Sequence, residues 1–422
     1  MWSRRPLAAF VAALSLLAAA CSASGSDAGR DGSVLRFQVS GEPEETAVYD
    51  ALANAYTEAH PEVEVEVVKV AEKSDHLARL STTFASGNPP DAFLVNFREF
   101  SQFAARRALE PVGPRLEDEG VDLADYYDAP IEAFTYDGQL QCMPQNISSL
   151  AVYYNRSLFE ELGVAEPPGR WDWQQFRRTA ERLSRDGVDG VGIEPTVIRL
   201  APFIWSNGGS LVDDEDAPTR FTFDDPRSAE AVDFVLGMVR DGLVPDEEQV
   251  AAQDLETRFE TGKLAMMLSS RVDTPRFREV RGLDWDVAPL PVADEPANIL
   301  HSDAYCVSRE GDQLDEVARF VAFAAGEQGQ TLTALGGRTV PSLRSVAESP
   351  AFLDPTQQPS RAQVWLDAVP HLRRTPVLPT WPEIEDLGED ALVRAFYDDV
   401  AVGETLAELD AETAPLFADG RS

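Results

Sequence analysis

The chain has 422 residues, and its 73 Asp and Glu residues against 36 Lys and Arg residues give a formal net charge of −37 at pH 7. Such an acidic balance disfavours nucleic acids and anionic lipid surfaces as partners. The length exceeds that of one ordinary hydrophobic core and therefore predicts two domains.

The first 20 residues have the features of a secretory signal peptide. Two arginines precede an apolar run over residues 7–20, which ends in alanines directly before Cys21. This run is too short for a comfortable membrane span and fits an export signal that is removed. Residues 17–21 resemble a bacterial lipobox, although the leucine lies one position further from the cysteine than the pattern prefers. The resemblance implies lipidation of Cys21 and a flexible tether over residues 21–33; the alternative is a secreted protein cut near residue 20.

The next part of the chain alternates strands with helices. Residues 34–40 are a short apolar strand, and residues 44–59 have the apolar spacing of a helix. In residues 63–67, valine alternates with glutamate, which is typical of a half-buried strand. A helix over residues 74–86 and a buried strand over residues 92–95 follow. This order predicts an α/β fold with a mostly parallel sheet and helices on both faces.

Polar residues follow the first and third of these strands. Glu42 and Glu44 come after the first strand, and Asn96 and Arg98 come after the third. Ligands of parallel sheets collect at the carboxyl ends of the strands. Each side chain alone fits a solvated loop, but together they predict one side of a cleft.

Residues 139–155 divide the chain. An extended run ends at Pro144, a polar step containing Asn146 and Ser148 follows, and a second apolar run leads to residue 155. Proline cannot donate to a sheet ladder, so one element ends at Pro144. A polar crossing between two bodies is where a small-molecule cleft is expected. No nucleophile elbow, HExxH or P-loop motif is present, so the sequence predicts a binder without catalytic residues.

The remainder again mixes helices and strands. A buried strand is predicted over residues 264–268 and a crossing strand over residues 304–308. Predicted helices lie at residues 171–184, 227–241, 255–261, 314–325, 360–369, 383–400 and 405–417.

Two cysteines remain if Cys21 carries a lipid. Cys142 and Cys306 both lie in short extended runs, and two cysteines in an exported protein favour a disulfide. The alternative is a pair of buried apolar thiols. Four dispersed histidines make a zinc site unexpected, and we expect neither a metal nor a cofactor.

Several short stretches, taken in order, resemble the extracellular solute-binding proteins of sugar ABC importers, the family that includes maltose-binding protein. Each stretch is weak alone, but the ordered set is specific and covers about residues 34–400. The family usually has a single threonine where Gly169 and Arg170 precede Trp171. The matching stretches are NPPD at 88–91, LEPV at 109–112, MP at 143–144, YYNRSLF at 153–159, PPGRW at 167–171, FETGKLAM at 259–266, PLP at 289–291 and YCVS at 305–308.

The resemblance implies a two-lobe α/β fold of the periplasmic-binding-protein type II, with hinge strands that join the lobes. It implies lobe 1 from residues 34–143 and 307–360, and lobe 2 from residues 144–306 and 361–422. A bond between Cys142 and Cys306 would then tie two hinge strands. It further implies a monomeric lipoprotein on the outer face of the bacterial cell membrane, which captures a carbohydrate, in our interpretation an oligosaccharide, and delivers it to an ABC permease.

A carbohydrate pocket needs aromatic faces for sugar rings and planar polar groups for hydroxyls. Trp205 and the neighbouring Asn207 are candidates, with core packing of the indole as the alternative. Trp381 lies between prolines, and this pattern predicts that its ring is exposed in a loop. Further polar candidates lie at three places. Ser269, Ser270 and Arg271 end the strand at 264–268, and His301 and Asp303 precede the second crossing. Arg338 lies in a Gly-Gly-Arg loop.

Three alternatives remain open from the sequence. An exported carbohydrate-active enzyme would use two carboxylates, which so acidic a chain supplies by chance. The basic residues near the predicted cleft leave a glycerol-phosphate-type anionic solute open. A surface receptor or adhesin would use the same lobes without transport.

Overall fold

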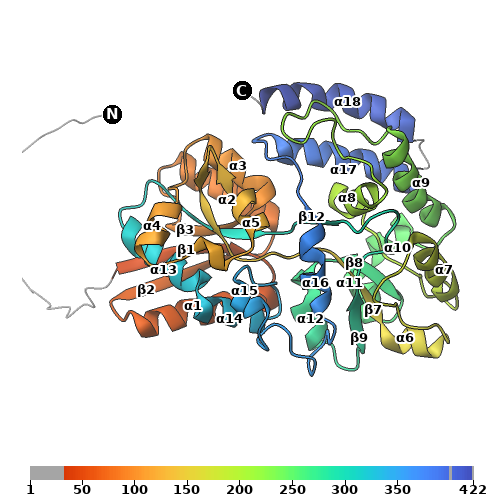
Figure 1. Cartoon of the computed structure of the whole chain (residues 1–422), viewed down its shortest axis with the longest axis horizontal. Helices are drawn as coiled ribbons and strands as arrows, with labels where there is room; N and C mark the ends of the chain where they lie inside the picture. Colours follow the sequence, from red (N-terminus) through yellow and green to blue (C-terminus); the bar gives the residue numbers. More distant parts are fainter. Residues whose placement is uncertain (1–32, 399–401, 421–422) are drawn as a thin grey trace, which may run out of the picture.

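The computed structural model describes residues 33–398 and 402–420. Its chain forms two bodies joined by several crossing segments (Figure 1). The predicted signal peptide and the lipidation site Cys21 lie outside the described residues. Among the described residues, no helix has the length and apolar character that crossing a membrane requires.

Lobe 1 is built on a five-stranded sheet. Its first three strands are parallel, and the fourth runs antiparallel to both of its neighbours. In spatial order the strands are β2 (Val63–Val70), β1 (Ser33–Ser40), β3 (Ala92–Asn96), β11 (Asp303–Val307) and β6 (Cys142–Pro144). Figure 1 shows α2 and α3 on one side of this sheet and α1 and α14 on the other. The lobe 1 helices are α1 (Pro43–Ala59), α2 (Lys73–Ala85), α3 (Phe97–Ala105), α4 (Gly113–Asp118), η1 (Leu123–Asp125), α5 (Asp128–Ala133), α13 (Leu314–Ala325), α14 (Glu327–Leu335) and α15 (Arg344–Ala347), beside the hairpin β4 (Thr135–Tyr136) and β5 (Gln139–Leu140).

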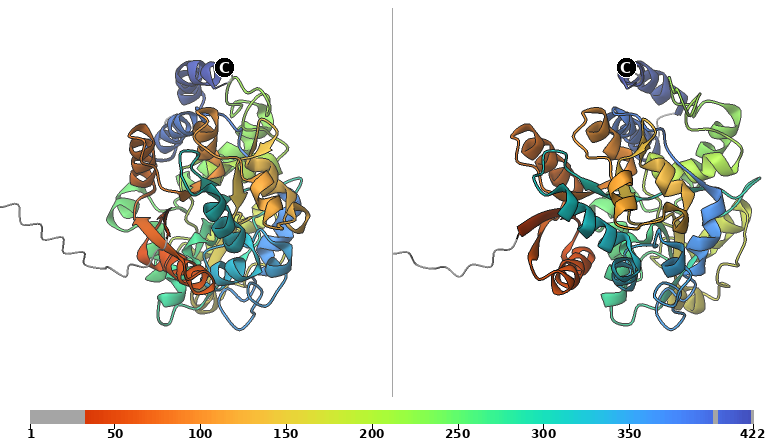
Figure 2. Two further views of the ribbon diagram at one scale, coloured as in Figure 1. Left: turned by 90° about the vertical axis from the view of Figure 1, so that its left-hand side faces the viewer. Right: turned by 60° about the vertical axis from the view of Figure 1, so that its left-hand side comes forward.

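Lobe 2 is built on a three-stranded antiparallel sheet. The spatial order is β8 (Met266–Ser269), β7 (Ala151–Asn155) and β9 (Trp285–Ala288). Around it lie α6 (Arg156–Glu161), α7 (Trp173–Leu183), α8 (Val197–Ser206), α9 (Pro226–Arg240), α10 (Glu247–Ala252), α11 (Leu255–Glu260), η2 (Arg271–Asp273), α12 (Thr274–Glu279), α17 (Trp381–Tyr397) and α18 (Val402–Asp419). The last two helices, blue in the figures, lie at one end of the molecule in every view (Figures 1 and 2).

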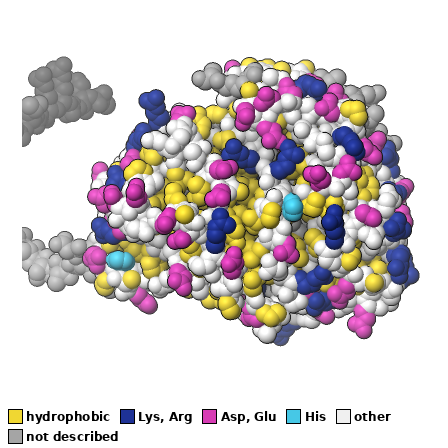
Figure 3. Space-filling view, in the orientation of Figure 1, with side chains coloured by type: hydrophobic (Ala, Val, Ile, Leu, Met, Phe, Trp, Pro, Cys, Tyr) yellow, Lys and Arg dark blue, Asp and Glu magenta, His cyan; other side chains and the backbone are white. Residues whose placement is uncertain are grey.

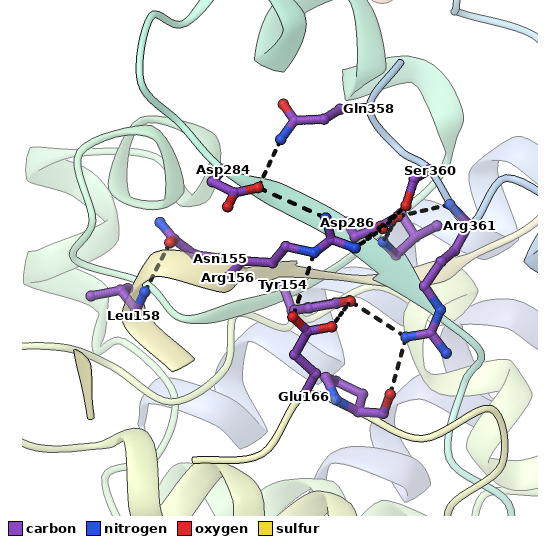
Figure 4. A network of polar contacts seen from close by, with 12 residues as sticks. Tyr154, Asn155, Arg156, Leu158, Glu166, Asp284, Asp286, Gln358, Ser360 and Arg361 are labelled. Carbon is purple, nitrogen blue, oxygen red and sulfur yellow. Dashed lines mark hydrogen bonds and ion pairs between the residues drawn. The ribbon is translucent and has the colours of Figure 1, made fainter. Parts of the chain in front are cut away.

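A strap of late chain runs along lobe 2. It contains α16 (Gln363–Ala368), η3 (Val369–His371) and β12 (Leu372–Arg373), and β12 pairs with β10 (Asn298–Ile299). Upstream of α16, the strap is bound to β9 through Asp286, a fully buried carboxylate. Its oxygens accept hydrogen bonds from Nη2 of Arg156 (2.5 Å), Oγ of Ser360 (2.5 Å) and the backbone N–H of Arg361 (3.0 Å; Figure 4).

Local sequence explains where the elements begin. Val63 and Val65 are buried while the intervening Glu64 is exposed, so the alternation places one face of β2 in the core. The Asn96 side chain accepts from the backbone N–H of Arg98 (3.3 Å) and caps α3.

Buried apolar side chains form two clusters. One includes Phe37, Tyr305 and Phe320 in lobe 1, and the other includes Phe203 and Trp381 in lobe 2. The first cluster also reaches β7 and β9 of lobe 2, so the joined side of the lobes is apolar and continuous. Figure 3 shows apolar side chains gathered along the middle of one face, with charged side chains of both signs around them.

The structure refines the predicted hinge. Both β6 and β11 belong to the sheet of lobe 1, whereas a division between residues 306 and 307 would cut β11. The chain leaves this sheet after Pro144 and re-enters it at Asp303, and the two crossing segments touch at a bridge between Ser148 and His301. The lobe boundaries remain predictions. Cys142 and Cys306 are joined by a disulfide in the structure.

Candidate functional site

A cavity of about 410 Å³ lies between the two lobes. Its walls come from the carboxyl ends of β1 and β3, the first turns of α1, α2 and α3, the crossing segments, and α8 and η2 of lobe 2. The volume is in the range of small-molecule sites. The lining residues are Ser40, Gly41, Glu42, Glu45, Ala71, Glu72, Lys73, His76, Leu77, Leu94, Val95, Asn96, Arg98, Glu99, Asn146, Ser148, Ile198, Arg199, Ser270, Val272, His301, Asp303 and Arg338.

Asp303, the first residue of β11, is held by three side chains of the cavity wall. Its Oδ1 accepts a hydrogen bond from Nδ2 of Asn96 (3.1 Å), and its Oδ2 accepts one from Nδ2 of Asn146 (3.4 Å). Nη1 of Arg338 lies 3.7 Å from the same Oδ2. The carboxylate therefore has a fixed orientation, and such fixed acceptors suit hydroxyl groups of a solute.

Arg338 connects this network to α1. Its Nε lies 3.7 Å from Oε2 of Glu45. Burial disfavours the charged guanidinium, but nearby groups led by Tyr49 and Glu45 raise the pKa of Arg338 above its ordinary value. Burial also raises the pKa of Glu45, and Arg338 opposes that rise.

The other cations of the cavity wall are paired in the same way. Nη1 of Arg98 lies 2.5 Å from Oε1 of Glu385, and its Nε donates to Oδ1 of Asn96 (3.2 Å). Lys73 lies 2.5 Å from Glu99, and Arg199 lies 2.8 Å from Glu194. Each lysine or arginine among the described lining residues thus already faces a carboxylate of the protein.

Two histidines line the cavity, and one of them has a ring nitrogen without a protein partner. Burial lowers the pKa of His301 well below its usual value, and the charges of Arg98 and Arg199 lower it further. Nε2 of His301 is buried and has no protein partner, so it is available to a solute. His76 is fixed by contacts of its ring nitrogens with Leu94 O (2.8 Å) and Gln38 Nε2 (3.2 Å).

The sequence between residues 40 and 331 matches the family described as bacterial extracellular solute-binding protein. The chain belongs to this family. A Brucella abortus protein that is named a putative binding protein is 23% identical to this solute-binding protein over 426 residues, which cover 97% of this chain and 99% of that protein.

Solved structures share the fold of this solute-binding protein. An ABC substrate-binding protein of Listeria monocytogenes, solved in complex with cycloalternan, has a TM-score of 0.83 and 22% identity and covers 90% of this chain and 98% of its own. The GacH receptor of Streptomyces glaucescens, solved unliganded and with acarbose, has a TM-score of 0.81 and 20% identity, with coverages of 92% and 99%. The predicted two-lobe α/β fold is confirmed.

Eight of the side chains predicted for a binding site of this solute-binding protein lie together on the cavity wall. They come from both lobes and from the crossing segments. These residues are Glu42, Asn96, Arg98, Ser148, Ser270, His301, Asp303 and Arg338. Glu44 lies in the first turn of α1, and its side chain is outside the described part of the structure.

The two tryptophans predicted to face a solute do not line the cavity. Trp381 is fully buried at the first position of α17, so the prediction of an exposed loop is wrong. The following proline fits the first turn of a helix, where no backbone donor is lost. Trp205 lies in the last turn of α8, buried, with the guanidinium of Arg373 5.0 Å from its ring. In the solute-binding protein these rings belong to the core of lobe 2.

Three predicted polar residues also lie outside the cavity wall. Asn207 ends α8 and donates to the backbone oxygen of Arg227 (2.9 Å). Ser269 donates to the buried carboxylate of Asp273. Arg271 is buried, with its guanidinium 4.5 Å from the Phe352 ring and 4.9 Å from the Trp365 ring, and burial lowers its pKa to about 9. These contacts hold the three side chains away from the cavity wall.

Sequence reasoning missed several cavity residues that helices supply. The signal for Glu45 was its position three residues after Glu42, since the two form a reciprocal capping box at the start of α1. No pattern pointed to His76 or Arg199, which lie on helices. None of the described lining residues is Phe, Tyr or Trp, so the cavity presents polar groups without the aromatic face that was expected.

Proposed function

We propose that this solute-binding protein captures a neutral carbohydrate in the cavity between its lobes and delivers it to the permease of an ABC importer. The observation that carries the proposal is the cavity itself, in which acceptors and donors from both lobes surround a space of about 410 Å³. Amide, hydroxyl, carboxylate and imidazole groups in a fixed array suit the many hydroxyls of a sugar.

The pairing of the cavity cations favours a neutral solute over a glycerol-phosphate-type anion. Arg98, Arg199 and Arg338 each already face a protein carboxylate, so a bound phosphate would meet acids as well as bases. The bound molecules named for the Listeria and Streptomyces structures, cycloalternan and acarbose, support a sugar. We therefore expect an oligosaccharide, and we expect no catalysis.

A thermal-shift screen tests the solute class. The panel contains maltose, maltotetraose, a cyclic tetrasaccharide, mannitol and sn-glycerol 3-phosphate. A solute present at a hundredfold excess over its Kd stabilises the folded protein by about 2.7 kcal/mol, which raises the melting temperature measurably. A shift with sn-glycerol 3-phosphate and with none of the neutral compounds would overturn the proposal.

The proposed location is the outer face of the cell membrane, through a lipid on Cys21, with the protein acting as a monomer. The lipobox resemblance supports the anchor, and the name of the family supports an extracytoplasmic place. Cys21→Ser is expected to move the protein from the membrane fraction to the soluble exported fraction. Retention of the variant in the membrane fraction would contradict lipid anchoring.

A further inference from the structure

Besides the crossing segments, the two lobes touch through a pair of helices. Helix α3 of lobe 1 lies against α17 of lobe 2, and Arg98 of α3 forms a 2.5 Å ion pair with Glu385 of α17. Only 12% of the Arg98 side chain and 6% of the Glu385 side chain are exposed. One turn further along α3, Oγ of Ser101 donates to the backbone oxygen of Leu378 (2.8 Å). A charged pair shielded from water is a strong contact between bodies that can separate.

Trp381 fixes the glutamate of this pair. Its indole Nε1 donates a hydrogen bond to Oε2 of Glu385 (3.1 Å), four residues later on the same helix. Oε1 of Glu385 is the atom that Arg98 contacts, so both carboxylate oxygens are engaged. The indole is fully buried and cannot move away from this position without disturbing the core. Trp381 therefore holds the carboxylate in the orientation that reaches across to lobe 1.

The contact continues into the cavity. Nε of Arg98 donates to Oδ1 of Asn96, and Nδ2 of Asn96 donates to Oδ1 of Asp303. A single chain of hydrogen bonds thus runs from the core of lobe 2 to the carboxylate on the cavity wall. Because Arg98 and Asn96 line the cavity and Glu385 does not, closure and solute contact are linked through Arg98.

We propose that Trp381, Glu385 and Arg98 form a closure latch, in which Trp381 is a positioning residue that acts on solute capture through Glu385 without touching the solute. The latch rests on the proposed capture of a solute between moving lobes and is independent of which solute is bound. Opening separates Arg98 from Glu385 and exposes both to water. A solute that contacts the wall around Arg98 favours the latched arrangement, and the latch in turn increases affinity.

The test measures the ligand-free protein by small-angle X-ray scattering, so it does not depend on the identity of the solute. Glu385→Gln removes the charge of the pair, and Trp381→Phe removes the indole N–H together with part of the ring volume while keeping a buried aromatic ring. Glu383→Gln is the matched control, because Glu383 is exposed on the same turn of α17. Close charge pairs between proteins couple by amounts that correspond to about tenfold or more in an equilibrium. We therefore expect about a tenfold lower closed-to-open ratio for Glu385→Gln, measured as a larger radius of gyration, and no change for Glu383→Gln.

The double variant Trp381→Phe/Glu385→Gln separates a positioning role from a structural one. If Trp381 acts through Glu385, the single variant Trp381→Phe has a larger radius of gyration than the wild type. The double variant then has the same radius of gyration as Glu385→Gln. Equal opening by Trp381→Phe in both backgrounds would overturn the positioning role. A ligand-free Glu385→Gln protein as compact as the wild type would overturn the latch. Failure of every sugar in the thermal-shift screen would overturn the proposed solute and leave this result unaffected.

Discussion

Cys142 of β6 lies directly opposite Cys306 of β11, and a disulfide joins them although 164 residues separate them in the sequence. Both strands belong to the sheet of lobe 1, and the chain turns toward lobe 2 only after Pro144. The resemblance implied a bond between two hinge strands. The bond joins the two strands of the lobe 1 sheet at which the crossing segments begin and end, and the position of the hinge stays a prediction.

The first prediction concerns this disulfide. Replacing both cysteines by alanine is expected to lower the free energy of unfolding by about 2–5 kcal/mol, because the bond restricts a long loop in the unfolded chain. Urea unfolding of the wild type and of Cys142→Ala/Cys306→Ala measures the difference. A reductant is expected to destabilise the wild type and to leave the double variant unchanged. Equal sensitivity of both proteins to the reductant would contradict the assignment.

The second prediction concerns the strap bound by Asp286. Asp286→Ala removes the acceptor of the Ser360 hydroxyl and the Arg361 backbone N–H, and it leaves Arg156 with only the more distant carboxylates of Glu166 (3.6 Å) and Asp284 (3.9 Å; Figure 4). Loss of this shared charged acceptor is expected to cost about 1.5–3 kcal/mol, which urea unfolding measures. Asp284→Ala is the control, because Asp284 is exposed and lies 3.9 Å from Arg156. Its loss is expected to cost less than about 1 kcal/mol, and similar losses for the two variants would contradict the interpretation.

The third prediction is a pH dependence that arises from Asp273. Burial, together with the charge of Glu256, raises the pKa of Asp273 to about 7. Because the Asp273 carboxyl binds its proton more tightly in the folded than in the unfolded protein, protonation stabilises the fold at low pH. This contribution to the free energy of unfolding is lost as the pH rises from about 4 through 7. Asp273→Asn is therefore expected to exceed the wild type in stability at pH 8 by up to about 4 kcal/mol. The difference should shrink steadily as the pH is lowered to 5.

Ser269 provides a second variant for the same measurement. Its hydroxyl donates to the Asp273 carboxylate and favours the ionised form. Ser269→Ala is therefore expected to lower the stability at pH 8 more than at pH 5. Urea unfolding of the three proteins across this pH range checks both expectations, and a constant difference between wild type and Asp273→Asn at every pH would refute them.

The fourth prediction concerns the cavity. Asp303→Ala removes the acceptor that Asn96, Asn146 and Arg338 share. It also removes one of the two carboxylates that balance the charge of Arg338. Loss of a charged hydrogen-bonding group is expected to weaken solute binding by about 1.5–3 kcal/mol, or roughly 10- to 100-fold. Isothermal titration with the sugar identified by thermal shift measures the affinity. Asp312→Asn, an exposed acid outside the cavity, is expected to bind as the wild type does. An unchanged affinity in Asp303→Ala would remove Asp303 from the site.

The sequence predicts those strands and site residues that are defined by patterns of neighbouring residues. The alternation of Val63 and Val65 with glutamates identified β2. The position after a strand identified Asn96, and the position before the second crossing identified Asp303, because strand ends define the cavity edge. The roles of the tryptophans could not be predicted from local patterns. Trp381 with its prolines reads as a loop, yet it begins α17, and its burial depends on packing of distant helices.

Contacts made by residues on helices were missed for a related reason. His76 lies on a helix whose polar spacing predicts a solvated face, and only the approach of β3 and β1 buries it. Glu385 belongs to the far end of the sequence, 287 residues from its partner Arg98. Contacts of this kind depend on how the two lobes meet, which the sequence pattern alone does not encode.

The pairing of every described cavity cation with a protein carboxylate has a consequence outside the cell. A neutral solute gains little from long-range attraction, so dissolved salt has little to screen. We therefore expect the affinity for the solute to be nearly the same at low and at high ionic strength. An uptake system with this receptor would keep its sensitivity through changes in osmotic conditions.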